Sequence, residues 1–157
     1  MRNLLAAGTA ALLLFGLGGC ERAEGDMREE GTVTAARLIG AGNDRSSWMT
    51  YGRTYDGQRF SPASQITPAN VGDLGLAWYA DLDTARGQEA TPLVIGGTLY
   101  TTTAWSKVKA YDGASGKLLW EYDPEVPGET GVKACCDVVN RGLAAWGDTL
   151  FLGTLDG

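Results

Sequence analysis

Histidine is absent from this chain of 157 residues, and cysteine occurs only three times. A metal site built from imidazoles or from two cysteine pairs is therefore disfavoured, because its ligands are missing. Basic residues are also few, since 13 Lys and Arg stand against 19 Asp and Glu and give a net charge of −6 without any basic cluster. This balance argues against a nucleic-acid partner, which would be attracted by positive charge.

An apolar run long enough to span a bilayer is also missing. The run over residues 4–17 follows Arg2 and ends on Leu17-Gly18-Gly19-Cys20, and it is shorter than the roughly 20 residues of a membrane-spanning helix. This pattern predicts an export signal over residues 1–19. The small residues before Cys20 resemble a bacterial lipobox, which predicts lipidation of Cys20 and a periplasmic, membrane-anchored chain. The alternative is an ordinary signal peptide with a chance cysteine, and in both cases the mature chain meets an oxidising compartment.

Residues 20–33 are charged and lack apolar periodicity, which predicts a polar tether. Two short helical turns are expected after it. The first covers 34–40, with Thr34 as N-cap and Gly40 as terminator. The second covers 67–74, with Thr67 as the cap and a proline at the first helical position.

The rest of the chain, 34–157, is rich in Gly and Trp and contains a repeat. Residues 76–81 (LAWYAD) match 118–123 (LLWEYD) at an offset of 42 residues, and 97–101 match 148–152 at an offset of 51. Alternating runs predict strands over 91–95, 99–103, 107–111 and 117–122, with turns at 96–97 and 112–116. Four short strands in a unit of roughly 40 to 50 residues are typical of a β-propeller blade. We therefore predict an all-β propeller of which about the first two blades are present.

Residues 110–120 (AYDGASGKLLW) resemble the Trp-docking repeat of quinoprotein propellers. Asp112 and Ser115 can bond to the turn backbone, Gly116 permits a positive φ, and Trp120 is expected to stack between neighbouring blades. The repeat indicates a fold and not a function. Non-enzymatic propeller lipoproteins that help to assemble outer-membrane proteins carry similar repeats.

Three further features point to chemistry. Residues 48–62 form an aromatic, turn-rich segment, Glu89 directly precedes an apolar strand, and Arg141 follows the doublet Cys135-Cys136. Glu89 would need a partner if it were buried, whereas an exposed loop position would need none. The sequence leaves both interpretations open.

The adjacent cysteines admit several states. Their Cα atoms lie about 3.8 Å apart across a trans peptide, below the roughly 4.4 Å usual for disulfides, so a bond between them closes a strained ring and no chain loop. Two free thiols would be open to oxidation, a metal site lacks further ligands, and pairing with other chains is a third alternative. These considerations favour a disulfide between Cys135 and Cys136.

As a set, residues 48–62 (WMTYGRTYDGQRFSP), Glu89, Cys135-Cys136 and Arg141 resemble the N-terminal segment of alcohol dehydrogenases that depend on pyrroloquinoline quinone (PQQ). The resemblance implies an eight-bladed propeller in which PQQ oxidises an alcohol to an aldehyde or ketone by hydride transfer. It also implies that the cysteine pair lies against PQQ, that Glu89 contacts PQQ and that Arg141 faces a PQQ carboxylate. A guanidinium suits this role because it binds carboxylates through two hydrogen bonds.

The same resemblance implies a Ca²⁺ ion and an electron acceptor such as cytochrome c or a quinone, and it leaves room for a haem c domain. The catalytic Asp and the Ca²⁺ ligands are expected beyond residue 157, so no catalytic or metal-binding residue is assigned here. We expect the 157 residues alone to be inactive and poorly folded. Two other classes stay open: a propeller scaffold, which would not need the cysteine pair, Glu89 or Arg141, and a sugar dehydrogenase with the same cofactor.

Overall fold

The computed structural model describes residues 31–157, so the export signal, Cys20 and most of the predicted tether lie outside the described residues. Helix α2 (Ala35–Ile39) begins after Thr34 and is followed by Gly40 as its C-cap, at the predicted positions. The Thr34 hydroxyl accepts a hydrogen bond from the Arg37 amide at 3.3 Å, which satisfies one of the amides that a first helical turn leaves unpaired. A 3₁₀ helix, η1 (Gly40–Asn43), follows directly. Within the described part of the chain, no helix is both long and apolar enough to cross a membrane.

The second predicted helix is shorter than expected, and its cap is a different residue. Only the 3₁₀ helix η2 (Val71–Asp73) forms, with Asn70 in the N-cap position. The Asn70 Oδ1 atom accepts hydrogen bonds from the Thr67 amide at 2.7 Å and from the Thr67 hydroxyl at 3.1 Å. The Thr67 side chain is therefore a donor in a local turn and does not cap a helix, because asparagine competes for such backbone groups.

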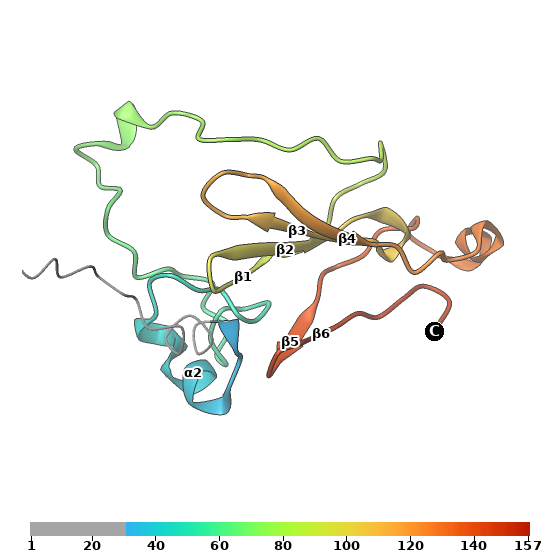
Figure 1. The fold of residues 1–157 in the computed structure, drawn as a ribbon, viewed down its shortest axis with the longest axis horizontal. Helices are drawn as coiled ribbons and strands as arrows, with labels where there is room; N and C mark the ends of the chain where they lie inside the picture. Colours follow the sequence, from blue (N-terminus) through green and yellow to red (C-terminus); the bar gives the residue numbers. More distant parts are fainter. Residues whose placement is uncertain (1–30) are drawn as a thin grey trace, which may run out of the picture.

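A four-stranded antiparallel sheet in the order β1-β2-β3-β4 forms the centre of the molecule (Figure 1). It starts where alternation in the sequence predicts strands, and its first turn contains Gly96 and Gly97, both with positive φ. The 3₁₀ helix η3 (Ala104–Ser106) connects the second strand to the third. The strands are β1 (Leu93–Ile95), β2 (Thr98–Thr102), β3 (Val108–Asp112) and β4 (Leu118–Tyr122).

A separate hairpin consists of β5 (Ala144–Trp146) and β6 (Thr149–Phe151). The two hairpin strands do not join the four-stranded sheet. The described residues therefore contain one four-stranded blade and two strands of another, in agreement with the predicted partial propeller.

The hydrophobic core joins the N-terminal segment to the blade. Leu93 and Ile95 of β1 are buried in one cluster with Val33, Leu38, Ala41 and Met49. Isolated antiparallel bridges continue this contact, since Trp48 pairs with Val94 in β1 and Val33 pairs with Gly147 in the β5–β6 turn. The N-terminal segment therefore contacts both the four-stranded sheet and the β5–β6 hairpin, and it holds the two together.

The Trp78 side chain packs on the turn of the Trp-docking repeat, residues 112–116. Its ring stacks on Tyr111 with the ring centroids 6.2 Å apart, and its Nε1 donates a hydrogen bond to the Gly113 carbonyl at 3.0 Å. Trp120, the repeat equivalent of Trp78, packs on Tyr100 of its own sheet and is 42% exposed. The described residues place no turn of a following blade beside it, so its stacking between neighbouring blades stays a prediction.

The turn that receives Trp78 has the predicted hydrogen bonds. The Asp112 carboxylate accepts from the Ser115 amide at 2.7 Å and from the Ser115 hydroxyl at 2.6 Å. These bonds hold the pKa of Asp112 below its ordinary value. They fix the turn on which the Trp78 ring rests.

Gly116→Ala in the complete protein is expected to destabilise the blade. Gly116 has a φ of +72°, and a Cβ there would lie 2.5 Å from Cδ2 of the Trp78 ring. The backbone strain costs about 1–2 kcal/mol, and forcing the ring away adds about 1–3 kcal/mol. Gly97→Ala is the matched control, because Gly97 has a φ of +76° and a Cβ added there would meet no atom within 4 Å. Urea unfolding measures both losses, and equal losses would contradict the docked position of Trp78.

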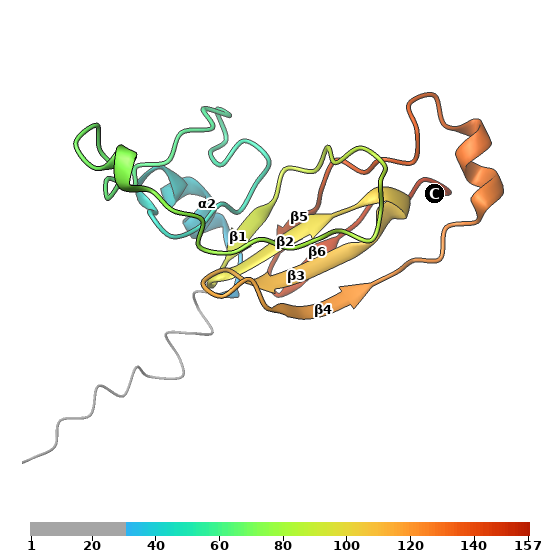
Figure 2. The ribbon, with the colours of Figure 1, turned by 90° about the horizontal axis from the view of Figure 1, so that it is seen from above.

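The segment after Trp78 crosses the sheet and returns to the start of β1 (Figure 2). The Asp83 carboxylate anchors it by pairing with Lys107 at 3.2 Å and with Lys109 at 3.3 Å. Burial raises the pKa of Asp83, but hydrogen bonds from both lysines outweigh it and lower that pKa below its ordinary value. Burial likewise lowers the pKa of Lys109, yet its bonds to Glu121 and Asp83 raise it overall. These ion pairs fix the chain just before Glu89.

Candidate functional site

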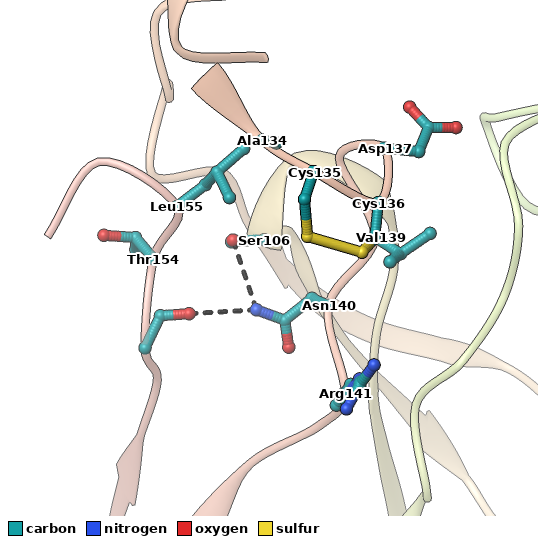
Figure 3. Close-up of a pocket in the computed structure, with 11 residues that line it drawn as sticks. Ser106, Ala134, Cys135, Cys136, Asp137, Val139, Asn140, Arg141, Thr154 and Leu155 are labelled. Atoms are coloured by element: carbon teal, nitrogen blue, oxygen red, sulfur yellow. Dashed lines mark hydrogen bonds between the residues drawn. A yellow bond between two sulfur atoms is a disulfide. The ribbon is translucent and has the colours of Figure 1, made fainter. Parts of the chain in front are cut away.

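The loop between η4 (Gly128–Lys133) and β5 contains the two adjacent cysteines. Cys135 and Cys136 are joined by a disulfide, with their Cα atoms 3.8 Å apart. The disulfide lines a hollow of about 300 Å³ together with Ser106, Asn140, Arg141 and residues 153–155 (Figure 3). This volume lies at the lower end of the range usual for small-molecule sites.

A backbone contact brings the start of β1 beside this loop. Thr91 forms a parallel bridge with Gly142, and the Thr91 amide donates a hydrogen bond to the Arg141 carbonyl at 3.3 Å. Gly142 has a φ of +121°, and a Cβ there would lie only 3.0 Å from the Thr91 carbonyl oxygen. The two chains can approach this closely because the residue is glycine.

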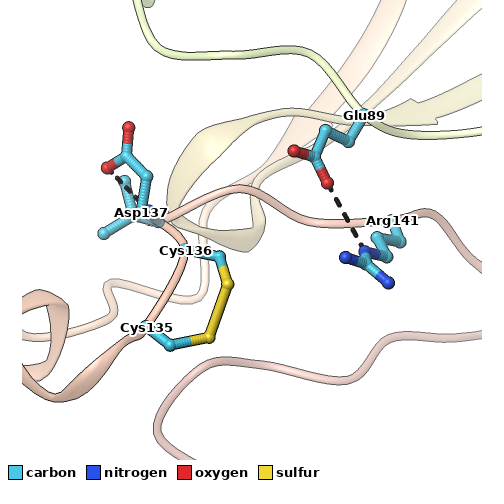
Figure 4. The surroundings of a disulfide bond; sticks show 6 residues. Glu89, Cys135, Cys136, Asp137 and Arg141 are labelled. Atoms are coloured by element: carbon cyan, nitrogen blue, oxygen red, sulfur yellow. Dashed lines mark hydrogen bonds and ion pairs between the residues drawn. A yellow bond between two sulfur atoms is a disulfide. The ribbon is translucent and has the colours of Figure 1, made fainter.

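This contact places Glu89 opposite Arg141. The Arg141 Nε atom lies 3.4 Å from the Glu89 Oε2 atom, and the two side chains are 80% and 47% exposed respectively (Figure 4). Glu89 is thus an exposed loop residue with a cationic partner. It lies beside Arg141 and outside the set of residues that line the hollow.

The exposure of the pair determines what Arg141 can do. An ion pair between exposed side chains contributes at most about 1 kcal/mol to stability, so this arginine is not needed to hold the fold. Most of its guanidinium faces solvent at the edge of the hollow, where it can donate hydrogen bonds to an anionic ligand.

Several neighbours of the disulfide were not identified from the sequence. Asp137 has a φ of +67° and forms an ion pair with Arg86, which stands 51 residues away in the chain. Trp105, also with positive φ, donates its amide hydrogen to the Val138 carbonyl at 2.8 Å. These contacts hold the disulfide loop on η3 and on the segment before Glu89. No local pattern marks them, because each joins residues that are distant in the chain.

The disulfide and Arg141, which both line the hollow, indicate the kind of ligand that it can bind. A disulfide presents a rigid, polarisable surface that suits contact with an aromatic ring, and Arg141 offers a forked cation to a carboxylate. Between residues 31 and 157, no three acidic, histidine or cysteine side chains gather as a metal ion requires. The fold and the site together define a β-propeller protein with a pocket wall suited to a planar, negatively charged cofactor.

The chain belongs to the glucose/ethanol/alcohol dehydrogenase β-propeller family, the PQQ family, whose model matches residues 48–154. It is 54% identical over 156 residues to the dehydrogenase subunit of a quinone-type alcohol dehydrogenase from Gluconacetobacter polyoxogenes, covering 99% of this chain and 21% of that subunit. It is 59% identical over 129 residues to the quinohemoprotein alcohol dehydrogenase ADH IIB of Pseudomonas putida, covering 82% of this chain and 18% of that protein.

A solved structure supports the same assignment. The quinohemoprotein alcohol dehydrogenase ADHIIG of Pseudomonas putida matches with a TM-score of 0.78 and 49% sequence identity, over 82% of this chain and 19% of that one. The predicted family and the propeller fold are therefore confirmed. The chain spans between 18% and 21% of the length of these relatives.

Proposed function

We propose that this chain is part of a periplasmic, PQQ-dependent alcohol dehydrogenase that oxidises alcohols to aldehydes or ketones. The observation that carries the proposal is the disulfide of Cys135 and Cys136, which lines the same hollow as the exposed guanidinium of Arg141. A propeller that served only as a scaffold would need neither feature. Membership of a family of glucose, ethanol and alcohol dehydrogenases supports the same conclusion.

The residues of this chain would bind and orient the cofactor. The disulfide would lie against one face of PQQ, and Arg141 would hold one of its carboxylates, with Glu89 beside it. When bound, PQQ supplies a quinone that accepts a hydride from the alcohol carbon. A Ca²⁺ ion and a catalytic Asp would be provided by other parts of the protein, so we propose that the 157 residues alone have no dehydrogenase activity.

The cellular setting is also a proposal. The export pattern before Cys20 supports a periplasmic protein that a lipidated cysteine anchors to a bacterial membrane. Electrons would leave through cytochrome c or a quinone. The likeness to quinohemoproteins favours a haem c domain elsewhere in the same protein.

PQQ titration of the protein expressed from its complete reading frame tests this function. With Ca²⁺ present, the oxidised protein is expected to bind PQQ and to reduce a dye when alcohols are added. Opening the disulfide with a reductant is expected to weaken PQQ binding about tenfold, because a sulfur–ring contact contributes up to about 1.5 kcal/mol.

The melting temperature serves as the control, and it should hardly change on reduction, since this disulfide closes no chain loop. Reoxidation should restore the affinity. An oxidised protein that fails to bind PQQ would overturn the proposed function.

A further inference from the structure

We propose that Asn140 is a positioning residue that sets the place of Arg141 and of the disulfide for the cofactor, an inference that rests on the proposed function. Its side-chain amide makes three hydrogen bonds, of which Figure 3 shows the two that its nitrogen donates. The Nδ2 atom donates to Ser106 Oγ at 3.2 Å and to the Gly153 carbonyl at 2.9 Å, and the Oδ1 atom accepts from the Gly142 amide at 3.0 Å. One side chain thus joins η3, the chain after β6 and the residue after Arg141.

The bond to Gly142 closes a turn around Arg141. Asn140 and Gly142 flank the arginine, and the Arg141 carbonyl itself accepts a hydrogen bond from the Thr91 amide at 3.3 Å. The backbone of Arg141 is therefore fixed from both sides, while its guanidinium remains largely exposed. A side chain with a fixed backbone and a free end can meet a ligand without a large loss of conformational freedom.

Ser106, the hydrogen-bond partner of Asn140 on the blade, lies in a backbone conformation that is rare for residues other than glycine. Trp105 and Ser106 are consecutive non-glycine residues with φ values of +65° and +59°, a conformation that costs free energy at each residue. Ser106 is buried, and its hydroxyl faces the hollow as the acceptor for Asn140. The connection between β2 and β3 thus presents this hydroxyl to the loop of the disulfide.

The chemistry requires an amide at position 140. Two donor bonds and one acceptor bond are made at once, and among side chains of this length an asparagine amide alone supplies both kinds of group without charge. Asn140 also lies outside the hydrophobic core cluster. Its loss should therefore loosen the cofactor loop more than it destabilises the blade.

Asn140→Ala in the complete protein is the direct test, with Asn70→Ala as the matched control. Asn70 makes bonds of the same kind in an exposed turn, where its Oδ1 accepts from the Thr67 amide at 2.7 Å and its Nδ2 donates to the Gln65 carbonyl at 2.8 Å. We expect Asn140→Ala to raise the Kd for PQQ by about fivefold, as the loss of about one net hydrogen bond implies. Asn70→Ala should leave the Kd unchanged, and both variants should lose similar amounts of thermal stability.

A second measurement needs no cofactor. The rate at which a thiol reductant opens the Cys135–Cys136 disulfide in PQQ-free protein should rise several-fold in Asn140→Ala and stay constant in Asn70→Ala, because only the first substitution frees the loop. Ser106→Ala removes one of the three bonds and should give a smaller change in the same direction. This variant also keeps the test available if Asn140→Ala fails to fold.

The outcomes separate the two proposals. Wild-type protein that does not bind PQQ would overturn the proposed function, and with it the role of Asn140 toward PQQ. Wild-type protein that binds PQQ, together with an Asn140→Ala variant of equal affinity and equal disulfide reduction rate, would overturn the inference alone.

Discussion

Arg141→Gln in the complete protein is expected to weaken PQQ binding by about 100-fold, since each hydrogen bond to a charged group contributes about 1.5–3 kcal/mol. The Arg141 side chain is 80% exposed at the edge of the hollow, and its guanidinium retains donors for a cofactor carboxylate. Arg141→Lys keeps the charge but loses the forked geometry, so a smaller loss of about tenfold is expected. Equilibrium titration with PQQ, monitored through the quenching of tryptophan fluorescence, measures the loss of affinity in both variants.

Arg86→Gln is the control for Arg141. It removes the same charge beside the same loop, because Arg86 is 53% exposed and pairs with Asp137, but Arg86 does not line the hollow. A general electrostatic effect of this kind is screened by salt. Equal weakening by Arg86→Gln and Arg141→Gln would show that overall charge, and not contact with Arg141, determines the affinity.

Arg53→Met in the complete protein is expected to lower the free energy of unfolding by about 2–3 kcal/mol, since a buried acceptor left without a donor costs about 1–3 kcal/mol and the two partly buried acceptors cost less. Arg53 is 3% exposed. Its guanidinium donates to the carbonyls of Ala41 and Asp44, both at 2.6 Å, and to the Phe60 carbonyl at 2.7 Å. It therefore joins η1 to the segment over residues 48–62, and urea unfolding measures the loss.

Arg59→Met provides the comparison for Arg53. Arg59 also has a positive φ, of +54°, but it is exposed, and its guanidinium lies over the Tyr51 ring at 4.0 Å. Such an exposed cation–π contact contributes only about 0.5–1 kcal/mol. A loss for Arg53→Met as small as that for Arg59→Met would contradict the role of the three carbonyl contacts.

The sequence pattern of residues 48–62 predicts only part of their burial. Its aromatic, turn-rich composition predicts a cover over an apolar surface, and Met49 is indeed buried in the core cluster beside Leu93. Tyr51, Tyr55 and Phe60 are nevertheless exposed. Burial of Arg53 was not expected from the pattern, since the three carbonyls that accept from its two terminal nitrogens come together only after the chain has folded.

Local patterns were sufficient for the secondary structure of the blade. Period-two alternation and glycine turns specify β1 to β4 because a strand's two faces and a turn's positive φ are properties of adjacent residues. The Thr34 cap of α2 is local for the same reason. The family was also recognisable from residues close together in sequence, above all the cysteine doublet and the arginine that follows it.

Contacts between distant residues were decided by the tertiary structure alone. Trp78 fills the docking turn, Glu89 meets Arg141 through the bridge of Thr91 to Gly142, and Asn140 joins η3 to the chain after β6. Each contact depends on which strand edges and loops lie side by side, and the packing of the N-terminal segment against the blade and the hairpin sets that arrangement. The sequence by itself therefore determined the strands, their turns and the family, while the tertiary structure decided how the residues of the pocket wall hold one another in place.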